Sequence, residues 1–310
     1  MSENLITPLD LKRLNQNSAF FIGWYNKFSD KNKSTYVVIA GFFKEKRSKP
    51  KAFIQYFNNS DSSSKYLTYT LNECEIDIEK QKISIGPNSI SLNQIKLNLS
   101  SIKIIFNITK INAYKYKGLG KNILGPLHYI PLVECKHSIL NIRGEFEGTI
   151  SHKNNEVDVK GLCYQEKDWG KSFPSKYFWI HADNFDTPAV SFQFAYAKTK
   201  WLLFKPKVYI GFLEVNNQII NLNKLGNTKI HIEQLTESKV EIILTKNKYI
   251  ISIMLISGNP ISLKGPINGI MNKNIGESLT SKLIINITDK RSPSKSFKIS
   301  TEQASSEVQL

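Results

Sequence analysis

Residues 74–111 read CEIDIEKQKISIGPNSISLNQIKLNLSSIKIIFNITKI, and apolar and polar side chains alternate along almost all of this stretch. A period of two is typical of half-buried β-strands, because successive side chains of a strand point to opposite faces of the sheet. Short Gly, Pro, Asn and Ser segments interrupt the alternation and indicate turns. Residues 74–111 therefore predict several consecutive short strands.

The rest of the chain repeats this pattern and adds strands that are more apolar. Alternation returns at TKIHIEQL (228–235), KVEIILTKNKYIISIML (239–255) and SKLIINITDK (281–290). Aromatic and β-branched runs at FFIGWY (20–25), YVVIAGFF (36–43) and AFIQYF (52–57) predict more fully buried strands. One short helix is expected at TPLDLKRLNQ (7–16), where Thr7 is the N-cap and Pro8 the first helical residue. This pattern favours an all-β chain, and 310 residues are enough for two antiparallel barrels.

A Gly- and Pro-rich stretch near the middle of the chain, YKGLGKNILGPLHYIP (116–131), interrupts the strand pattern. We interpret it as the start of a crossover between two halves. The expected domains are an N-terminal barrel over residues 1–142, which includes the crossover 116–142, and a C-terminal barrel over residues 143–302. The polar residues 303–310 predict a mobile tail.

Composition and charge restrict the classes of protein and partner. The chain is 41% hydrophobic, has no apolar run long enough to span a bilayer, and begins without the pattern of a secretory leader. These features predict a cytoplasmic protein. The net charge of +16 comes from scattered lysines and from two short clusters, KEKRSKPK (44–51) and DKRSPSK (289–295). No nucleic-acid motif accompanies them, so we expect no nucleic-acid partner and only a weak, peripheral attraction to anionic membrane surfaces.

Motifs for several common chemistries are missing from the sequence. It has neither the GxSxG nucleophile pattern nor a dinucleotide-binding fingerprint, and KGLGK (117–121) lacks the spacing of a phosphate loop. In HYIPLVECKH (128–137), Cys135 and His137 share one strand face, but no third ligand follows at a recognisable spacing. We therefore predict no metal and no cofactor. Glu134 interrupts the apolar run of this segment, and a buried carboxylate would need partners or a raised pKa.

The segment YQEKDWGKSFPSKYFWIHADN (164–184) places three adjacent charges beside the densest aromatic run of the chain. If residues 176–182 form a strand, Tyr177, Trp179 and His181 share one face. Two interpretations are open for the charges. They mark an exposed turn beside core aromatics, or they line an apolar cavity and act there.

Several blocks of the chain, in order, resemble the tocopherol cyclase-like family, in its divergent bacterial branch. The blocks are GWYNK (23–27), AFIQ (52–55), GPLHYIPLVECKHSILNIRGEFEGTI (125–150), GLCYQEKDWGKSFPSKYFWIHADNF (161–185) and LKGPINGIMNKNIGESLTSKL (263–283). The resemblance implies two lipocalin-like antiparallel β-barrels in tandem, related to those of carotenoid 1,2-hydratases. The family's namesake enzyme closes a prenylated quinol into a chromanol, without cofactor or redox change, by protonating an alkene and trapping the cation with the phenol oxygen.

The same resemblance implies roles for residues of the 164–184 segment and its neighbours. The candidate acids are Glu166, Asp168 and Glu134, one of which must stay protonated near neutral pH. Aromatic faces would stabilise the cation. The expected substrate-binding residues are Trp24, Tyr25, His137, Tyr164, Lys167, Trp169, Tyr177, Trp179 and His181.

Three functions remain open from the sequence. The first is an isomerase of the cyclase type, or a hydratase, that acts on a hydrophobic prenyl or isoprenoid-type substrate without a cofactor. The second is a carrier that holds a lipid or terpenoid inside a barrel without changing it. The third is a surface-associated role through the basic residues. The partner common to the first two is a hydrophobic small molecule.

Overall fold

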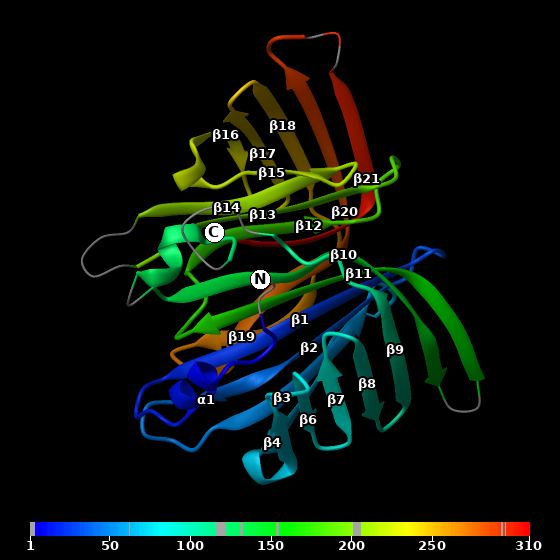
Figure 1. The fold of residues 1–310 in the computed structure, drawn as a ribbon, viewed down its shortest axis with the longest axis vertical. Coiled ribbons are helices and arrows are strands. Elements are labelled where there is room, and N and C mark those ends of the chain that lie inside the picture. Colours follow the sequence, from blue (N-terminus) through cyan, green and yellow to red (C-terminus); the bar gives the residue numbers. More distant parts are fainter. Residues whose placement is uncertain are drawn as a thin grey trace.

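The computed structural model describes residues 4–61, 63–115, 122–130, 133–152, 155–200, 206–292, 294 and 296–310. It shows tandem lipocalin-like antiparallel barrels, one of them nearly closed, together with one α-helix (Figure 1). The predicted all-β fold class is therefore confirmed. Among the described residues, no helix is long and apolar enough to cross a membrane.

The first sheet contains eleven strands in the order β4-β3-β2-β1-β11-β10-β9-β8-β7-β6-β5. These strands are β1 (Phe20–Asp30), β2 (Thr35–Lys44), β3 (Lys51–Asn58), β4 (Lys65–Thr70), β5 (Cys74–Asp77), β6 (Lys82–Ile85), β7 (Asn88–Ser91), β8 (Gln94–Leu99), β9 (Ile102–Lys110), β10 (Cys135–His152) and β11 (Asn155–Gly170). Short 3-10 helices lie at Leu71–Glu73 and Gly125–Tyr129. Residues 74–111 form the five short strands β5 to β9, as their alternation predicts.

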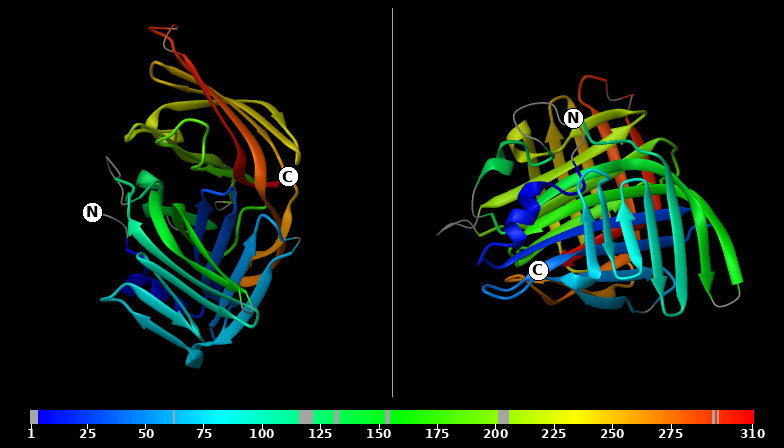
Figure 2. Two further views of the ribbon diagram at one scale, coloured as in Figure 1. Left: turned by 90° about the vertical axis from the view of Figure 1, so that its right-hand side faces the viewer. Right: turned by 60° about the horizontal axis from the view of Figure 1, so that its bottom comes forward.

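The second sheet contains the remaining strands in the order β15-β14-β13-β12-β21-β20-β18-β17-β16, with β19 paired to β20. They are β12 (Lys176–Ala182), β13 (Val190–Lys198), β14 (Lys207–Val215), β15 (Gln218–Asn221), β16 (Thr228–Leu235), β17 (Lys239–Lys246), β18 (Tyr249–Ile256), β19 (Ile261–Ile267), β20 (Ile270–Asp289) and β21 (Phe297–Gln309), with a 3-10 helix at Lys224–Gly226. The hairpin of β19 and β20 reaches across to the first sheet, which Figure 2 shows in orange beside the blue strands. At its tip, the backbone of Gly269 packs against the backbone of Phe20 and Lys44.

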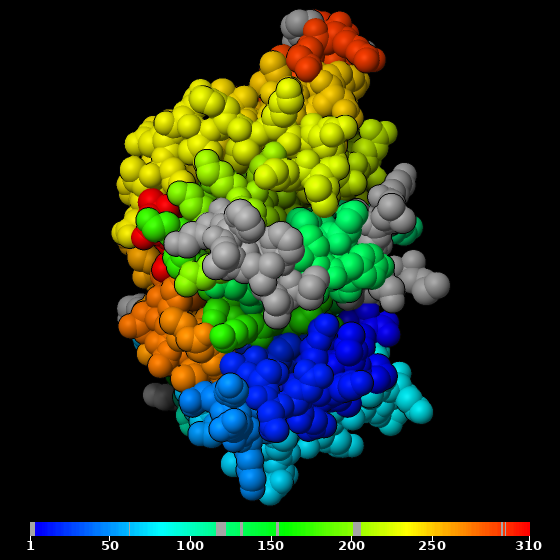
Figure 3. Space-filling model, turned by 90° about the vertical axis from the view of Figure 1, so that its left-hand side faces the viewer, coloured from blue at the N-terminus to red at the C-terminus, as the bar shows by residue number. Residues whose placement is uncertain are grey.

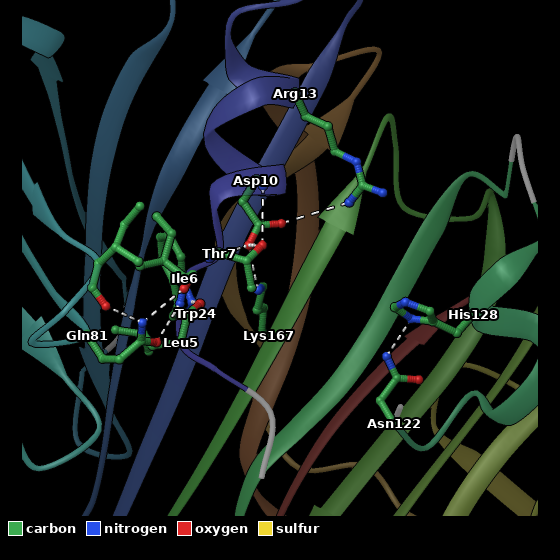
Figure 4. A network of polar contacts seen from close by, with 11 residues as sticks. Leu5, Ile6, Thr7, Asp10, Arg13, Trp24, Gln81, Asn122, His128 and Lys167 are labelled. Carbon is green, nitrogen blue, oxygen red and sulfur yellow. Dashed lines mark hydrogen bonds and ion pairs between the residues drawn. The ribbon is translucent and has the colours of Figure 1, made fainter. Parts of the chain in front are cut away.

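The N-terminal segment closes over the first barrel. The helix α1 (Pro8–Leu14) begins with a capping box between Thr7 and Asp10, as its sequence predicts. Leu5 and Ile6 are fully buried, and the Trp24 indole Nε1 donates a hydrogen bond to the Leu5 carbonyl oxygen at 2.7 Å (Figure 4). Figure 3 shows this segment in blue on the outside of the molecule, next to the orange hairpin.

The buried apolar residues form three clusters. One is enclosed by the first sheet and contains Trp24 and Trp169. A second is enclosed by the second sheet and contains Phe178 and Phe194. The third lies between the two sheets and takes Tyr25 from β1 and Trp179 from β12. Each barrel is thus filled by its own side chains, and the faces that meet between the barrels make a separate core.

Two expectations about the domains are wrong. The predicted boundary after residue 142 falls inside β10, and the chain passes from the first sheet to the second between β11 and β12. The Gly- and Pro-rich stretch precedes β10 and stays within the first half; its residues 116–121 and 131–132, including KGLGK (117–121), lie outside the described part of the chain. The expected mobile tail 303–310 belongs largely to β21, which pairs with β12 and β20. The strand β21 has a neighbouring strand on each side, and the small side chains of Ser305 and Ser306 are buried there.

Candidate functional site: a cavity between the two sheets

An apolar cavity of about 160 Å³ lies between the two sheets. The first sheet contributes Phe21, Gly23 and Tyr25 to its wall, and the second contributes Tyr177 and Trp179. Leu263, Pro266, Met271 and Ile275 of the β19–β20 hairpin close another side. The cavity is therefore in the interface between the barrels, whereas the carrier hypothesis places the ligand inside one barrel.

Glycines on two neighbouring strands account for the hollow in the first sheet. Gly23 of β1 pairs in register with Gly41 of β2, and on its other side with Asp168 of β11. A Cβ atom added to Gly41 would come within 2.2 Å of the Ile22 carbonyl oxygen, so this position requires glycine. A Cβ atom on Gly23 would meet its neighbours only at 3.7 Å or more. The absence of a side chain at Gly23 thus leaves open space above the sheet.

Two carboxyl groups and one imidazole meet in the cavity wall. Glu166 and Asp168 are two residues apart on β11, so both point to the cavity face. His137 of β10 is the cross-strand partner of Asp168, and its Nδ1 lies 2.8 Å from Asp168 Oδ1. Its Nε2 lies 3.6 Å from Glu166 Oε2. Tyr164, on the same strand face, donates its hydroxyl hydrogen to Glu166 Oε2 at 2.6 Å.

Burial controls the protonation of this cluster. Burial raises the pKa of Glu166 from 4.5 to about 8, although the nearby His137 opposes this shift. Burial lowers the pKa of His137, but the charges of Glu166 and Asp168 outweigh it and raise that pKa to about 9. Near neutral pH these two pKa values favour a protonated Glu166 beside a His137 imidazolium, whose Nδ1 contacts Asp168.

A second pair of acids lies on the opposite wall. Glu307 of β21 lines the cavity and accepts a hydrogen bond from the Tyr177 hydroxyl at 2.5 Å. Its cross-strand neighbour Glu277 accepts one from the Tyr25 hydroxyl at 2.6 Å. Burial raises the pKa of Glu307 to about 7. Burial and the charge of Glu307 raise the pKa of Glu277 well above its usual value.

The sequence prediction did not include Glu277 or Glu307. Glu277 lies at strand spacing between Ile275 and Leu279, so the sequence places a carboxyl group on an apolar strand face there. Glu307 lies in the segment that was interpreted as a mobile tail, so its polar neighbours concealed a strand. Recognition of the alternation in Ala304, Ser306 and Val308 could have indicated that strand.

A third set of polar residues lies behind the cavity. The Lys27 ammonium is fully buried, 3.3 Å from Asp183 Oδ1 and 3.5 Å from His181 Nδ1. The ring of Tyr164 stacks on His181 with a centroid separation of 3.8 Å. Burial, with the charge of Lys27, lowers the pKa of His181 well below its usual value, so His181 is neutral. This set joins the two sheets next to Glu166.

The structure brings six of the predicted site residues to the cavity wall: Tyr25, His137, Glu166, Asp168, Tyr177 and Trp179. Tyr164 and His181 lie directly behind them. Glu166 and Lys167 are 5% and 2% exposed, so the exposed-turn interpretation of the three adjacent charges is wrong. The face shared by Tyr177, Trp179 and His181 on β12 is confirmed.

Four predicted site residues lie elsewhere. Lys167 and Trp169 occupy the alternate positions of β11 and point into the first barrel, where Trp24 also lies. The Lys167 ammonium is 2.8 Å from Asp10 Oδ2 of the helix α1, and Figure 4 shows this contact with Thr7 and Arg13 around it. Glu134 does not line the cavity; its Oε2 accepts a hydrogen bond from the backbone N–H of Lys200 at 2.8 Å.

The cluster of His137, Glu166 and Asp168 could also hold a divalent cation. One ligand atom from each residue lies within 4.8 Å of the others, and an imidazole with two carboxylates suits several transition metals. Each of these side chains already has a partner within the protein, however: Asp168 binds His137, and Tyr164 binds Glu166. The Nε2 atom of His137, however, is buried and has no hydrogen-bond partner among the described residues.

Comparisons with known proteins agree with this fold. The chain is similar to the crystal structure of CghA with Sch210972, at a TM-score of 0.56 and 10% identity over 95% of this chain and 89% of that one. It is also similar to kievitone hydratase from Nectria haematococca, at a TM-score of 0.55 and 10% identity over 94% and 89% of the two chains. No curated protein matches the sequence. The model of the tocopherol cyclase-like family matches residues 91–309, which include all the acidic residues of the cavity. The chain belongs to the tocopherol cyclase-like family.

Proposed function

We propose that this protein is an enzyme that catalyses the acid-promoted cyclisation, or hydration, of a hydrophobic prenyl-type alkene. Family membership supports a cyclase- or hydratase-type enzyme. The observation that carries the proposal is the position of Glu166, a carboxyl group held protonated in the wall of an apolar cavity. Such a group can donate a proton to a carbon–carbon double bond near neutral pH.

Each member of the acid cluster has a distinct role in this mechanism. Glu166 donates the proton, because it lines the cavity and its pKa lies above neutrality. Asp168 binds His137 Nδ1 and orients the imidazolium, which then faces the carboxylate that Glu166 becomes. Tyr164 holds the Glu166 carboxyl group in place through its hydroxyl. The reaction needs no redox step, so we propose that these side chains act without a cofactor.

The remaining wall suits a carbocation intermediate. Phe21, Tyr25, Tyr177 and Trp179 present aromatic rings to the cavity, and a cation over an aromatic face gains about 2 kcal/mol when water is excluded. The apolar hairpin residues keep bulk water from competing with the intended nucleophile.

Cavity size restricts the part of the substrate that is enclosed. A cavity of about 160 Å³ is close to the roughly 150 Å³ of an engineered cavity that binds benzene. The enclosed part is therefore about the size of one benzene ring or of one short branched alkene. A longer isoprenoid tail would have to extend through the opening or displace side chains of the wall.

The carrier hypothesis explains the apolar wall but not its ionisable groups. Burial of a carboxyl group costs free energy, and a carrier of a hydrocarbon gains no binding affinity from a buried carboxyl group. Glu166, Asp168, His137 and Glu307 all line the same cavity. The shifted pKa values of Glu166, His137 and Glu307 in one cavity are typical of an active site.

The proposal is tested with 2-prenylhydroquinone, which joins one ring to a five-carbon branched alkene, and with homologues of longer chain. The wild-type protein is expected to convert at least one of them into its chromanol isomer of unchanged mass. Glu166→Gln should lower kcat by about a hundredfold or more, because it removes the proton donor. Glu302→Gln, on the exposed face of β21, is the matched control and should have no effect.

Two outcomes would count against the proposal. Full turnover by Glu166→Gln would remove Glu166 from the role of acid. Recovery of every probe unchanged, together with tight binding in native mass spectrometry, would favour the carrier.

A further inference from the structure

Exposed lysines form a row across one end of the second sheet. Lys176 of β12, Lys198 of β13 and Lys207 of β14 are cross-strand partners, and all three are exposed. The Lys224 ammonium extends the row, since it donates a hydrogen bond to the Lys207 carbonyl oxygen at 3.1 Å. Within the described part of the chain, no ion pair includes any of these four lysines. Like charges on opposite strand residues destabilise a sheet, so an anionic partner would stabilise the row.

The basic turn of the first sheet lies at the same end of the molecule. The segment KEKRSKPK (44–51) spans the turn from β2 to β3. At the tip of the β19–β20 hairpin, the backbone of Gly269 packs against the Lys44 carbonyl oxygen and donates a hydrogen bond to the Lys171 carbonyl oxygen at 2.8 Å. Lys171 lies in the turn that leads into β12, where the lysine row begins. Figure 3 looks onto this end, with the β2–β3 turn in lighter blue below the orange hairpin.

The cavity opens at this basic end. One position further along the same three strands, Tyr177, Ala197 and Val208 are cross-strand partners, and all three line the cavity. Lys264 of β19 also lines the cavity, and it is exposed. The apolar cavity therefore reaches the surface beside the lysine row.

The charge around the opening is strongly one-sided. The basic residues there come from Lys224 and from four described segments, which together we call the basic rim: 44–51, 171–176, 198–200 and 206–207. Glu45 is the only acidic residue of these segments. Glu134 lies beside the rim, where its carboxylate accepts a hydrogen bond from the Lys200 backbone N–H. The rim thus holds a large part of the excess positive charge of the chain.

We propose that the basic rim docks onto a membrane surface that contains anionic lipids, so that the cavity opening faces the bilayer. The phosphate groups of such lipids complement the lysine row, and each lysine near an anionic surface strengthens binding about fivefold. A hydrophobic molecule would then pass between the acyl chains and the cavity without crossing water. This inference goes beyond the proposed function, because it names a surface and its partner and adds no step to the reaction.

The cavity opening distinguishes a membrane from other anionic partners. Nucleic acids and acidic proteins would pair with the lysines, but neither has a use for an apolar cavity that opens among them. Leu225, next to Lys224, is 53% exposed and adds an apolar side chain to the same end. Lysines around exposed apolar side chains are typical of proteins that lie at a membrane interface. The charge and the apolar surface therefore favour the same partner.

Vesicle binding tests the docking surface. The probes are vesicles of phosphatidylcholine and vesicles in which about a third of the lipid is phosphatidylglycerol, and co-sedimentation gives the partition coefficient. The wild-type protein should bind only the anionic vesicles and should lose most of this binding at about 0.5 M NaCl. Lys176→Gln/Lys198→Gln/Lys207→Gln, the row variant, should lower the partition coefficient about a hundredfold, because it removes three lysines from the surface. The corresponding triple change to arginine should bind like the wild-type protein, and a hundredfold loss there would overturn docking through charge.

A matched variant controls for net charge. Lys82→Gln/Lys96→Gln/Lys103→Gln removes three exposed lysines from β6, β8 and β9 of the first sheet, so it has the same net charge as the row variant. Its partition coefficient should stay within a few fold of the wild-type value. Equal losses in the two variants would overturn the docking surface, because net charge alone would then explain the binding. Equal binding of the wild-type protein to both kinds of vesicle would also overturn it.

A DNA duplex of about 20 base pairs tests the alternative partner. Tighter binding of the wild-type protein to this duplex than to anionic vesicles, with loss in the row variant, would assign the rim to nucleic acid and overturn the inference.

Turnover separates docking from chemistry. The row variant should convert a long-chain prenylhydroquinone more slowly than the wild-type protein when the substrate is supplied in anionic vesicles, and at the same rate when it is supplied in detergent micelles. Equal rates in vesicles would overturn the entry of substrate through the rim. A protein that binds vesicles through the rim but converts no probe would overturn the proposed function and leave the docking surface intact.

Discussion

Replacement of Glu166 by glutamine should change how the stability of the protein depends on pH. Burial raises the pKa of Glu166 from 4.5 to about 8, and unfolding returns it to its usual value. Below pH 4.5 the carboxyl group is protonated in both states, so its full contribution to stability is present. Between pH 4.5 and 8 the folded protein keeps a proton that the unfolded chain releases, so the free energy of unfolding falls as pH rises. The shift spans about 3.5 pH units, and at about 1.36 kcal/mol per unit the loss approaches 5 kcal/mol at pH 8.

Glutamine has no such proton, so the variant should lack this loss. Urea unfolding followed by circular dichroism, between about pH 5 and 8, should show the variant gaining on the wild-type protein by about 1.4 kcal/mol per pH unit. His137 acts in the same direction, because the charge of Glu166 helps to raise its pKa to about 9. The control Glu302→Gln, whose side chain is 70% exposed, should run parallel to the wild-type curve. A parallel curve for Glu166→Gln would show that this carboxyl group is ionised in the folded protein, and the mechanism would fail.

Three further predictions concern the residues around the cavity. Gly23→Leu should fill the hollow and weaken 2-prenylhydroquinone binding at least tenfold in calorimetry, while Gly23→Ala, whose Cβ meets no atom closer than 3.7 Å, should fold normally. Lys27→Met should lower the free energy of unfolding by about 3–5 kcal/mol in urea titrations, because it leaves Asp183 buried without its counterion; a second change, Asp183→Leu, should restore much of the loss. Lys167→Met should speed hydrogen exchange of residues 4–16, because it removes the partner of Asp10, yet leave ligand binding within a few fold of the wild-type value.

Strand alternation predicts much of the fold and part of the site. The strands at 176–182 and 228–235 match β12 and β16 residue for residue, because both have aromatic or β-branched side chains and clear turn residues on each side. The period of two also places Glu166 with Asp168, and Tyr177 with Trp179, on common faces. These local rules need no knowledge of the partner strand.

The rest of the site depends on which faces of the two sheets pack against each other. Alternation within one strand does not predict that packing. Trp24 and Trp169 are as aromatic as Trp179, yet they fill the first barrel because their strand positions point inward. Glu277 and Glu307 become neighbours only when β20 pairs with β21. The polar composition of 303–310 suggested exposure, but pairing on both sides of β21 satisfies its backbone and buries its serines.

The alternate orientation of the charges in β11 bears directly on the mechanism. Glu166 faces the cavity, and the next residue, Lys167, faces the first barrel and binds Asp10 of the helix α1. Tyr164 holds Glu166 from the same face, so this part of the strand is fixed by buried polar contacts on both sides. Proton transfer to carbon requires a donor held to within about 0.5 Å of its productive position, which is about 3 Å from the double bond. The ion pair of Lys167 with Asp10 in the first barrel thus fixes the backbone of β11. The same stretch of backbone positions Glu166 in the cavity wall, where the proposed mechanism needs it.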